Sequence, residues 1–197
     1  MNIIEIPKTL LAGEPTDLKI TADCWIAGGA IRNWYLGKPN KSDIDFFFAH
    51  EAAFELFKSE NSMSGVRPIQ SSKNAETFKV NGKLIQLIRV ADYANVEALL
   101  DSFDFTVCQF AYDGEKVYST VEAITCVHRG HLMVNKIQAG YELDSLRRAF
   151  KYAKKGFEPC WGCLKEIADS FRDLSADALQ QQLEISPSGG KRVKRFD

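Results

Sequence analysis

The sequence predicts an α+β fold in which helices flank a mixed, largely antiparallel sheet, with a short helical segment after it. Two hairpin signals predict the antiparallel part, because Asn81-Gly82 and Asp113-Gly114 each separate two β-rich runs and such pairs form tight hairpin turns. Strand-like and helix-like runs alternate up to about residue 120, and the pattern beyond it is helical. The chain has 197 residues with 45% hydrophobic residues, which suits one globular core.

The first half of the chain is predicted to place strands on either side of glycine and proline turns. Short apolar runs indicate the strands, and apolar residues at helical spacing indicate the helices. In chain order, these elements are a strand at 24–27, a Gly-Gly break at 28–29, a helix at 30–36, a turn at 37–40, a strand at 44–49, a helix at 51–59 and a loop at 60–72.

The second half begins with two hairpins and ends in helices. Its elements are strands at 77–80 and 83–90, a helix at 93–100, strands at 106–112 and 116–120, and helices near 144–155, 163–174 and 176–183. We expect a head domain at residues 1–140, a short helical segment at 141–185 and a flexible basic tail at 186–197.

Composition narrows the class of protein. With 25 basic and 26 acidic side chains the net charge is −1, which excludes coating of nucleic acid by bulk charge. No apolar run reaches the roughly 18 residues of a membrane helix, and Met1–Pro15 lacks the pattern of a secretory signal. We therefore expect a soluble, cytoplasmic protein with no membrane partner, and its five cysteines are expected to be reduced. Its oligomeric state stays open.

Cys160 and Cys163 have the spacing of metal ligands, and Cys126, His128 and His131 are available to complete a zinc site. The second group is irregularly spaced, and the cysteine pair lies at a predicted helix start. Thiols packed as small apolar groups are therefore the favoured interpretation.

The sharpest chemical feature is the pair Asp43 and Asp45 at the start of a strand. Side chains alternate along a strand, so both carboxylates lie on one face while Ile44, Phe46 and Phe48 lie on the other. Two carboxylates on one face repel each other unless a cation lies between them, and hard oxygen ligands suit Mg²⁺ shared with substrate phosphates. The alternative is a solvated strand end.

Upstream, a strand, Gly28-Gly29 and a helix start allow backbone N–H groups to approach a phosphate, with Arg32 in the first helical turn. A plain strand-to-helix turn explains the two glycines alone equally well. The acidic pair Asp43 and Asp45 lies only about ten residues beyond Arg32. The glycine turn and the acidic pair together therefore indicate a phosphate site more specifically than the glycines alone.

Three segments together resemble the polymerase-β-type nucleotidyltransferase superfamily, and most closely the head of tRNA CCA-adding enzymes and bacterial poly(A) polymerases. They are the run IAGGAIRNWYLGKPNKSDIDFFF, the run DFTVCQFAY from Asp104, and the run RAFKYA from Arg148 followed by Gly156-Phe157. They occur in the order found in those enzymes and span residues 25–157.

The resemblance implies metal-assisted transfer of a nucleoside monophosphate from an NTP to a hydroxyl. Asp43 and Asp45 would hold two Mg²⁺ ions, with Mn²⁺ as an alternative, and Asp104 would be a third catalytic residue through a metal or ribose contact. The nucleotide would be bound by a set of residues from all three segments: Gly28, Gly29, Arg32, Asp104, Arg147 and Arg148.

The sequence departs from the motifs of those enzymes at positions that bear on which nucleotide and which acceptor are used. Asn33 and Ser102-Phe103 replace polar residues usual in those enzymes, and Asp144-Ser145-Leu146-Arg147 fits their base-reading motif in one register only. On the 83–90 strand, Gln86 stands where some relatives carry an acid. From the length of the chain we expect no counterpart of their long tRNA-gripping body.

The helix that follows carries Arg147, Lys151, Lys154 and Lys155 at i, i+4, i+7 and i+8, a positive stripe that suits either an anionic ligand or a solvated face. Four further basic residues lie in the tail. We expect an RNA 3′ end as acceptor, with tRNA as first choice. The alternatives are nucleotidylation of a protein or small molecule, such as AMPylation, and an inactive nucleotide- or RNA-binding module.

Overall fold

The fold is described from a computed structural model, which describes residues 1–40, 43–89 and 92–184. The basic tail predicted at 186–197 lies outside these residues. Within them, every helix is too short or too polar to cross a lipid bilayer.

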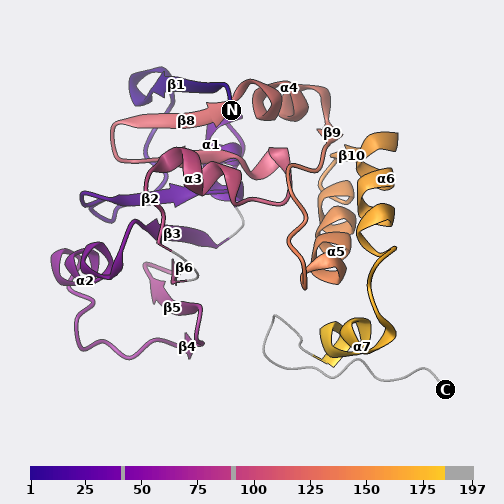
Figure 1. Ribbon diagram of the computed structural model, residues 1–197. Helices are drawn as coiled ribbons and strands as arrows, with labels where there is room; N and C mark the ends of the chain where they lie inside the picture. The colour runs from indigo at the N-terminus through magenta and orange to yellow at the C-terminus, as the bar shows by residue number, and fades with distance from the viewer. Residues whose placement is uncertain (41–42, 90–91, 185–197) are drawn as a thin grey trace.

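A twisted main sheet forms the centre of the molecule (Figure 1). The described residues give it eight strands in the spatial order β1-β8-β7-β2-β3-β6-β5-β4, and of these neighbours β3 and β6 alone run parallel. The strands are β1 (Ile3–Pro7), β2 (Cys24–Ala27), β3 (Ile44–Phe48), β4 (Gln70–Ser71), β5 (Ala75–Val80), β6 (Lys83–Ile88), β7 (Phe110–Tyr112) and β8 (Lys116–Thr120). The prediction of a mixed, largely antiparallel sheet is confirmed.

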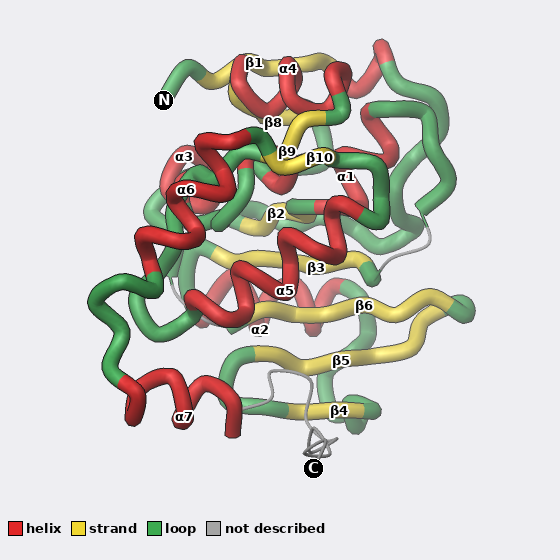
Figure 2. Tube along the Cα trace, turned by 90° about the vertical axis from the view of Figure 1, so that its right-hand side faces the viewer, coloured by secondary structure: helices red, strands yellow, loops and turns green. Residues whose placement is uncertain are grey.

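Helices lie on both sides of this sheet. In chain order they are α1 (Gly29–Tyr35), α2 (Glu51–Glu60), α3 (Val96–Asp101), α4 (Val121–Arg129), α5 (Glu142–Ala153), α6 (Trp161–Ser170) and α7 (Ala176–Glu184). In Figure 1 α5 and α6 lie to the right of the sheet and α2 lies to its left, and in Figure 2 α5 and α6 lie in front of the strands.

Strand β3 separates a packed face from a functional face. Phe46 and Phe48 pack on α2, with ring centroids 4.6 Å from Phe57 and 5.3 Å from Phe54 respectively. Phe47 points to the opposite face. It is this opposite face that carries Asp43 and Asp45, as the alternation of the sequence predicts.

The turn between β5 and β6 matches its sequence signal closely. Asn81 and Gly82 both have positive φ, at 49° and 79°, and Val80 pairs with Lys83, which is the geometry of a two-residue hairpin loop.

The segment predicted as one strand at 106–112 is instead a 3₁₀ turn, η2 (Thr106–Cys108), followed by β7. The turn allows Thr106 to bond to the carbonyl of Met133 through its backbone N–H at 3.1 Å, so a tertiary contact overrides the local β-propensity. Short β9 (His131–Leu132) and β10 (Glu158–Pro159) also pair in parallel, and this main-chain pairing joins the α5–α6 region to the rest of the fold.

Candidate functional site

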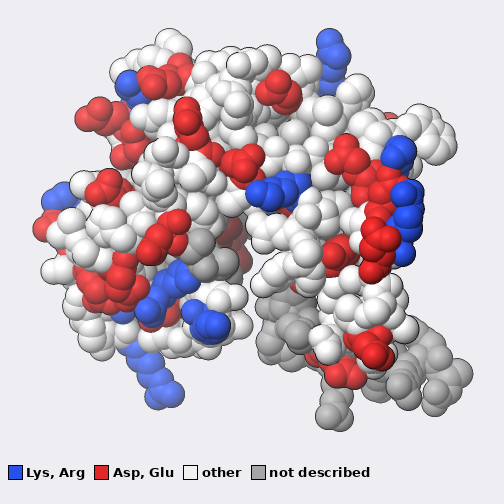
Figure 3. Space-filling model, in the orientation of Figure 1, with Lys and Arg blue, Asp and Glu red and all other residues white. Residues whose placement is uncertain are grey.

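A cleft lies between the functional face of the sheet and α5, and it contains two adjoining cavities. The first has a volume of about 400 Å³ and is lined by Gly28, Gly29, Ala30, Arg32, Asp43, Asp45, Phe47, Gln86, Ile88, Phe103, Cys108, Arg148, Lys151, Tyr152 and Lys155. The second, of about 610 Å³, shares Phe47, Ile88, Phe103, Arg148 and Lys151 with it. In Figure 3 the surface is hollowed between the part that carries α2 and β4–β6 and the part that carries α5–α7, with blue basic side chains at its upper end.

The two predicted metal-binding carboxylates lie together in the first cavity. Asp45 pairs in register with Ala27 of β2 and with Gln86 of β6. Gln86 Nε2 donates to Asp43 Oδ2 at 3.3 Å, so an amide lies beside the two acids. Burial, and then repulsion from Asp43, raise the pKa of Asp45 to about 7, which marks a group that lacks a full counter-charge.

This raised pKa predicts how stability depends on pH. The carboxyl of an unfolded aspartate titrates near about 3.9, so between that pH and about 7 the folded chain binds an extra proton at Asp45. Stability contributed by this group therefore falls as pH rises through that window. Urea unfolding at about pH 5 and about pH 8 should show a larger loss in the wild type than in Asp45→Asn. Equal losses in the two proteins would show that Asp45 titrates normally.

The glycine turn forms the floor of the first cavity, at the start of α1. Gly28 has φ 86°, a conformation that other residues adopt only with strain, and a Cβ there would lie 3.8 Å from the Phe103 ring. The turn thus requires glycine for its shape and keeps the backbone open to a ligand.

Arg32, predicted to contact phosphate, is 1% exposed and lies in the cavity wall. Its Nη1 donates to the Val107 carbonyl at 3.2 Å, and its guanidinium stacks near the rings of Phe157, at 4.8 Å, and Tyr152, at 5.7 Å. Its Nε is buried without a hydrogen-bond partner among the described residues. The side chain is therefore held rigidly while one donor remains unused.

Asp104 lies in the second cavity and does not join Asp43 and Asp45. Arg148 forms an ion pair with it at 3.0 Å, and Ser145 Oγ donates to its other oxygen at 3.4 Å. Arg148 also lies 3.2 Å from the Tyr152 hydroxyl, which bonds to the Cys108 thiol at 2.8 Å. This network, at the boundary of the two cavities, connects α5 to the sheet.

The basic helix presents a different set of side chains to the cleft from the predicted stripe. Arg148, Lys151 and Lys155 line the first cavity. Arg147 reaches the second one, where it pairs with Asp144 at 3.6 Å, and Lys154 is exposed outside both. The difference arises because Ala149 and Tyr152 are buried against the core, which sets the rotation of α5.

The residues present fit a Mg²⁺ ion that shares its ligands with a nucleotide. Mg²⁺ is commonly held by one or two carboxylates together with substrate phosphates and water, and the half-buried pair Asp43 and Asp45 is such a donor set. No group of three or more His, Cys, Asp or Glu side chains suited to a metal occurs in the described parts of the chain, so phosphates would have to complete the shell.

The cysteines take structural roles. Cys160 Sγ accepts the backbone N–H of Cys163 at 3.4 Å and caps α6, while Cys126 and Cys163 are buried. His128 bonds to the Tyr35 hydroxyl at 3.1 Å. These contacts agree with the interpretation of the thiols as small packed groups.

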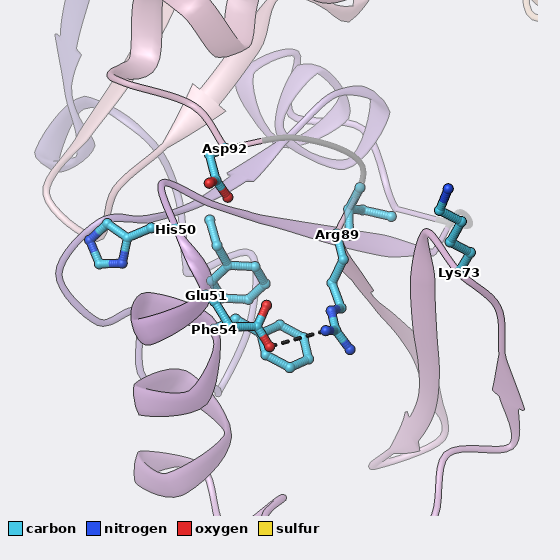
Figure 4. A pocket seen from close by; sticks show the side chains of 8 residues that line it. His50, Glu51, Phe54, Lys73, Arg89 and Asp92 are labelled. Atoms are coloured by element: carbon cyan, nitrogen blue, oxygen red, sulfur yellow. Dashed lines mark hydrogen bonds and ion pairs between the residues drawn. The ribbon is translucent and has the colours of Figure 1, made fainter.

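A further cavity, of about 330 Å³, lies beside the start of α2 (Figure 4). Its Arg89 is bound by Glu51 at 3.0 Å and by Glu76 at 3.5 Å and lies over the Phe54 ring at 4.7 Å. Arg89 is therefore already paired, whereas Lys73, which also lines this cavity, occurs in none of the ion pairs of the described residues.

The sequence matches the family described as Gabija anti-defense 2 family protein over residues 6–130. It is similar to "Gabija anti-defense 2" of Bacillus phage SPbetaL7, with 28% identity over 133 residues. The match covers 67% of this chain and 33% of that protein. The chain thus spans about a third of the length of this curated relative.

Solved structures with the same fold are CCA-adding enzymes and related tRNA nucleotidyltransferases. The CCA-adding enzyme of Thermotoga maritima, complexed with tRNA, aligns with a TM-score of 0.57 at 18% identity, over 82% of this chain and 42% of its own. A tRNA nucleotidyltransferase complexed with a primer tRNA and an incoming ATP analog gives a TM-score of 0.56 at 18% identity, over 83% and 49%. The fold is therefore the nucleotidyltransferase-like fold that the sequence resemblance implies.

Proposed function

The chain belongs to the Gabija anti-defense 2 family, and from that premise we propose that it is a Mg²⁺-dependent nucleotidyltransferase. It transfers a nucleoside monophosphate from an NTP to a hydroxyl acceptor. The observation that carries this proposal is the pair of carboxylates Asp43 and Asp45 in a cleft whose opposite wall is cationic. In this proposal the head predicted at residues 1–140 would provide one wall, and the helical segment predicted at 141–185 would provide the other.

Asp43 and Asp45 would hold two Mg²⁺ ions, or Mn²⁺ in their place. When bound, the metal supplies Lewis-acid stabilisation of the charge on the transferring phosphate. The carboxylates contribute only when deprotonated, so the pKa of Asp45 near 7 couples metal binding to pH.

The remaining wall residues position the nucleotide. The Gly28-Gly29 turn lines the cavity at the start of a helix, where phosphate is favoured. The N–H of Gly28 donates to the Phe110 carbonyl at 2.8 Å, so this bond holds the turn in place. The unused Nε of Arg32 and the guanidinium of Arg148 add positive charge beside the turn. Preformed dipoles and charges of this kind stabilise a transition state without reorganising.

The second cavity is proposed to hold the sugar and base. It is lined by aromatic side chains together with Asp104 and Arg147, which suits a flat ring with polar edges. Asp104 is already paired with Arg148, so a ribose contact suits it better than a metal contact.

An RNA 3′ end, with tRNA as first choice, is the proposed acceptor. The support is the fold shared with enzymes solved with tRNA. The family name favours a second candidate, in which the acceptor is a protein of the defence named Gabija. A third outcome, nucleotide or RNA binding without transfer, is left to experiment.

The acceptor is tested by incubating the protein with Mg²⁺ and each α-labelled NTP in turn, together with total RNA or with lysate protein from cells that carry Gabija. We expect label in the RNA fraction. Label in the protein fraction would instead identify a protein as the acceptor, which is the second candidate. NTP binding with label in neither fraction would favour the binding module.

Asp43→Ala is the inactive control for this assay, and Asp17→Ala, an exposed aspartate outside the cleft, is its matched partner. We expect no label with the first and wild-type labelling with the second. If Asp43→Ala still labels the acceptor, the carboxylate pair is not the catalytic site.

A further inference from the structure

Two cations of the cleft, Lys151 and Lys155, have no carboxylate partner in the part of the chain that the structure describes. Among the ion pairs of the described residues, Arg148 is bound to Asp104 and Arg147 to Asp144, while neither lysine occurs in one. Both lysines line the first cavity. Their charges are therefore available to an anion from outside the chain.

The lysines converge on the same region as Arg32. Burial lowers the pKa of Lys155, and the positive charges of Lys151 and Arg32 lower it further, so three cations lie within electrostatic reach of one another. Arg32 adds a buried Nε without a partner. Like charges this close to one another repel, and an anion bound between them would relieve the repulsion.

The opposite side of the cavity fixes the kind of anion. Lys151 also interacts with the charge of Asp45, so the space has carboxylates on the β3 side and ammonium groups on the α5 side. A polyphosphate carrying a divalent cation matches both sides, because the metal faces the acids and the outer oxygens face the lysines. A volume of about 400 Å³ is within the range of ligand sites.

We propose that Lys151 and Lys155 bind the β- and γ-phosphates of the NTP, so that the helical segment completes the triphosphate site of the head. This inference rests on the proposed function. It also assigns the two lysines to the nucleotide instead of the acceptor, since both line the cavity that contains the glycine turn, whereas Lys154 lines neither cavity.

The test measures binding of inorganic tripolyphosphate to the full chain by calorimetry with metal removed, so that the phosphates meet the protein alone. Lys151→Gln and Lys155→Gln should each weaken binding by about tenfold, the effect of losing a charge-assisted hydrogen bond. Lys154→Gln removes the same charge from the same region and should change binding by no more than about twofold. Melting temperatures check that all variants are folded.

Equal weakening by Lys154→Gln, or unchanged binding in Lys151→Gln and Lys155→Gln, would overturn the assignment. This result is separable from the proposed function. Lysine-dependent tripolyphosphate binding without nucleotidyl transfer would leave the site intact and refute the enzyme. If both lysine variants transfer at wild-type rates with an unchanged KM for the NTP, the enzyme assignment stands and the lysine site is refuted.

Discussion

Asp45→Asn is expected to reduce nucleotidyl transfer by about a thousandfold or more while the protein remains as stable as the wild type or becomes more stable. Loss of a group that stabilises transition-state charge commonly costs about 10²–10³ in rate, and here the change also removes a metal ligand. Stability is expected to stay the same or to rise, because burial and the nearby charge of Asp43 raise the pKa of Asp45 to about 7. Asparagine removes both the burial of charge and the repulsion.

A loss of activity without a loss of stability distinguishes a functional carboxylate from a structural one. Thermal unfolding without metal gives the stability, and labelled-NTP assays give the rate. Asp17→Asn is the control, since that aspartate is exposed away from the cleft, and both of its values should match the wild type. A variant at Asp45 that loses stability along with activity would mean that the carboxylate is structural.

Arg148→Gln should destabilise the protein by about 2 kcal/mol, because it leaves Asp104 buried without its counter-charge. The Asp104 side chain is 11% exposed and that of Arg148 is 42% exposed, so the loss is smaller than for a fully buried pair. Activity should fall as well, since Arg148 borders both cavities. Denaturant unfolding measures the stability term separately.

Arg147→Gln is the matched control on the neighbouring position of α5. Its pair with Asp144 is longer, at 3.6 Å, and partly exposed, so we expect a loss below about 1 kcal/mol. Adding Asp104→Asn to Arg148→Gln should restore part of the lost stability, because the stranded charge is removed. If the double variant is as unstable as the sum of the two single ones, Arg148 and Asp104 act independently.

Local sequence patterns predicted the parts of the fold that depend on local physics. The β3 strand with its alternating acids and phenylalanines, the turn at Gly28 and the Asn81-Gly82 hairpin each follow from side-chain alternation or from the need for positive φ. The edge strand β1 was missed, because five residues with two partly buried side chains give a weak periodic signal. The strand β9 of two residues gives none.

The parts of the site that depend on tertiary packing were harder to predict. Arg32 is enclosed by Phe157 and Tyr152, and its burial cannot be seen in the helix that carries it. Which basic residues of α5 enter the cleft depends on how Ala149 and Tyr152 pack. On a helical projection centred on those two buried residues, Arg148 and Lys155 lie on the same side. The spacing of the charges alone places Lys155 with Arg147 and Lys154 instead.

One measurement tests most directly whether the cleft of Asp43 and Asp45 performs nucleotidyl transfer. It compares NTP labelled at the α-phosphate with the same NTP labelled at the γ-phosphate. Both are incubated with the protein, Mg²⁺ and the acceptor fraction. We expect the α label to become attached to the acceptor, and all of the γ label that reacts to be recovered as pyrophosphate. With Asp45→Asn we expect neither product. Attachment of the γ label, or attachment of the α label that persists in Asp45→Asn, would contradict nucleotidyl transfer by this cleft.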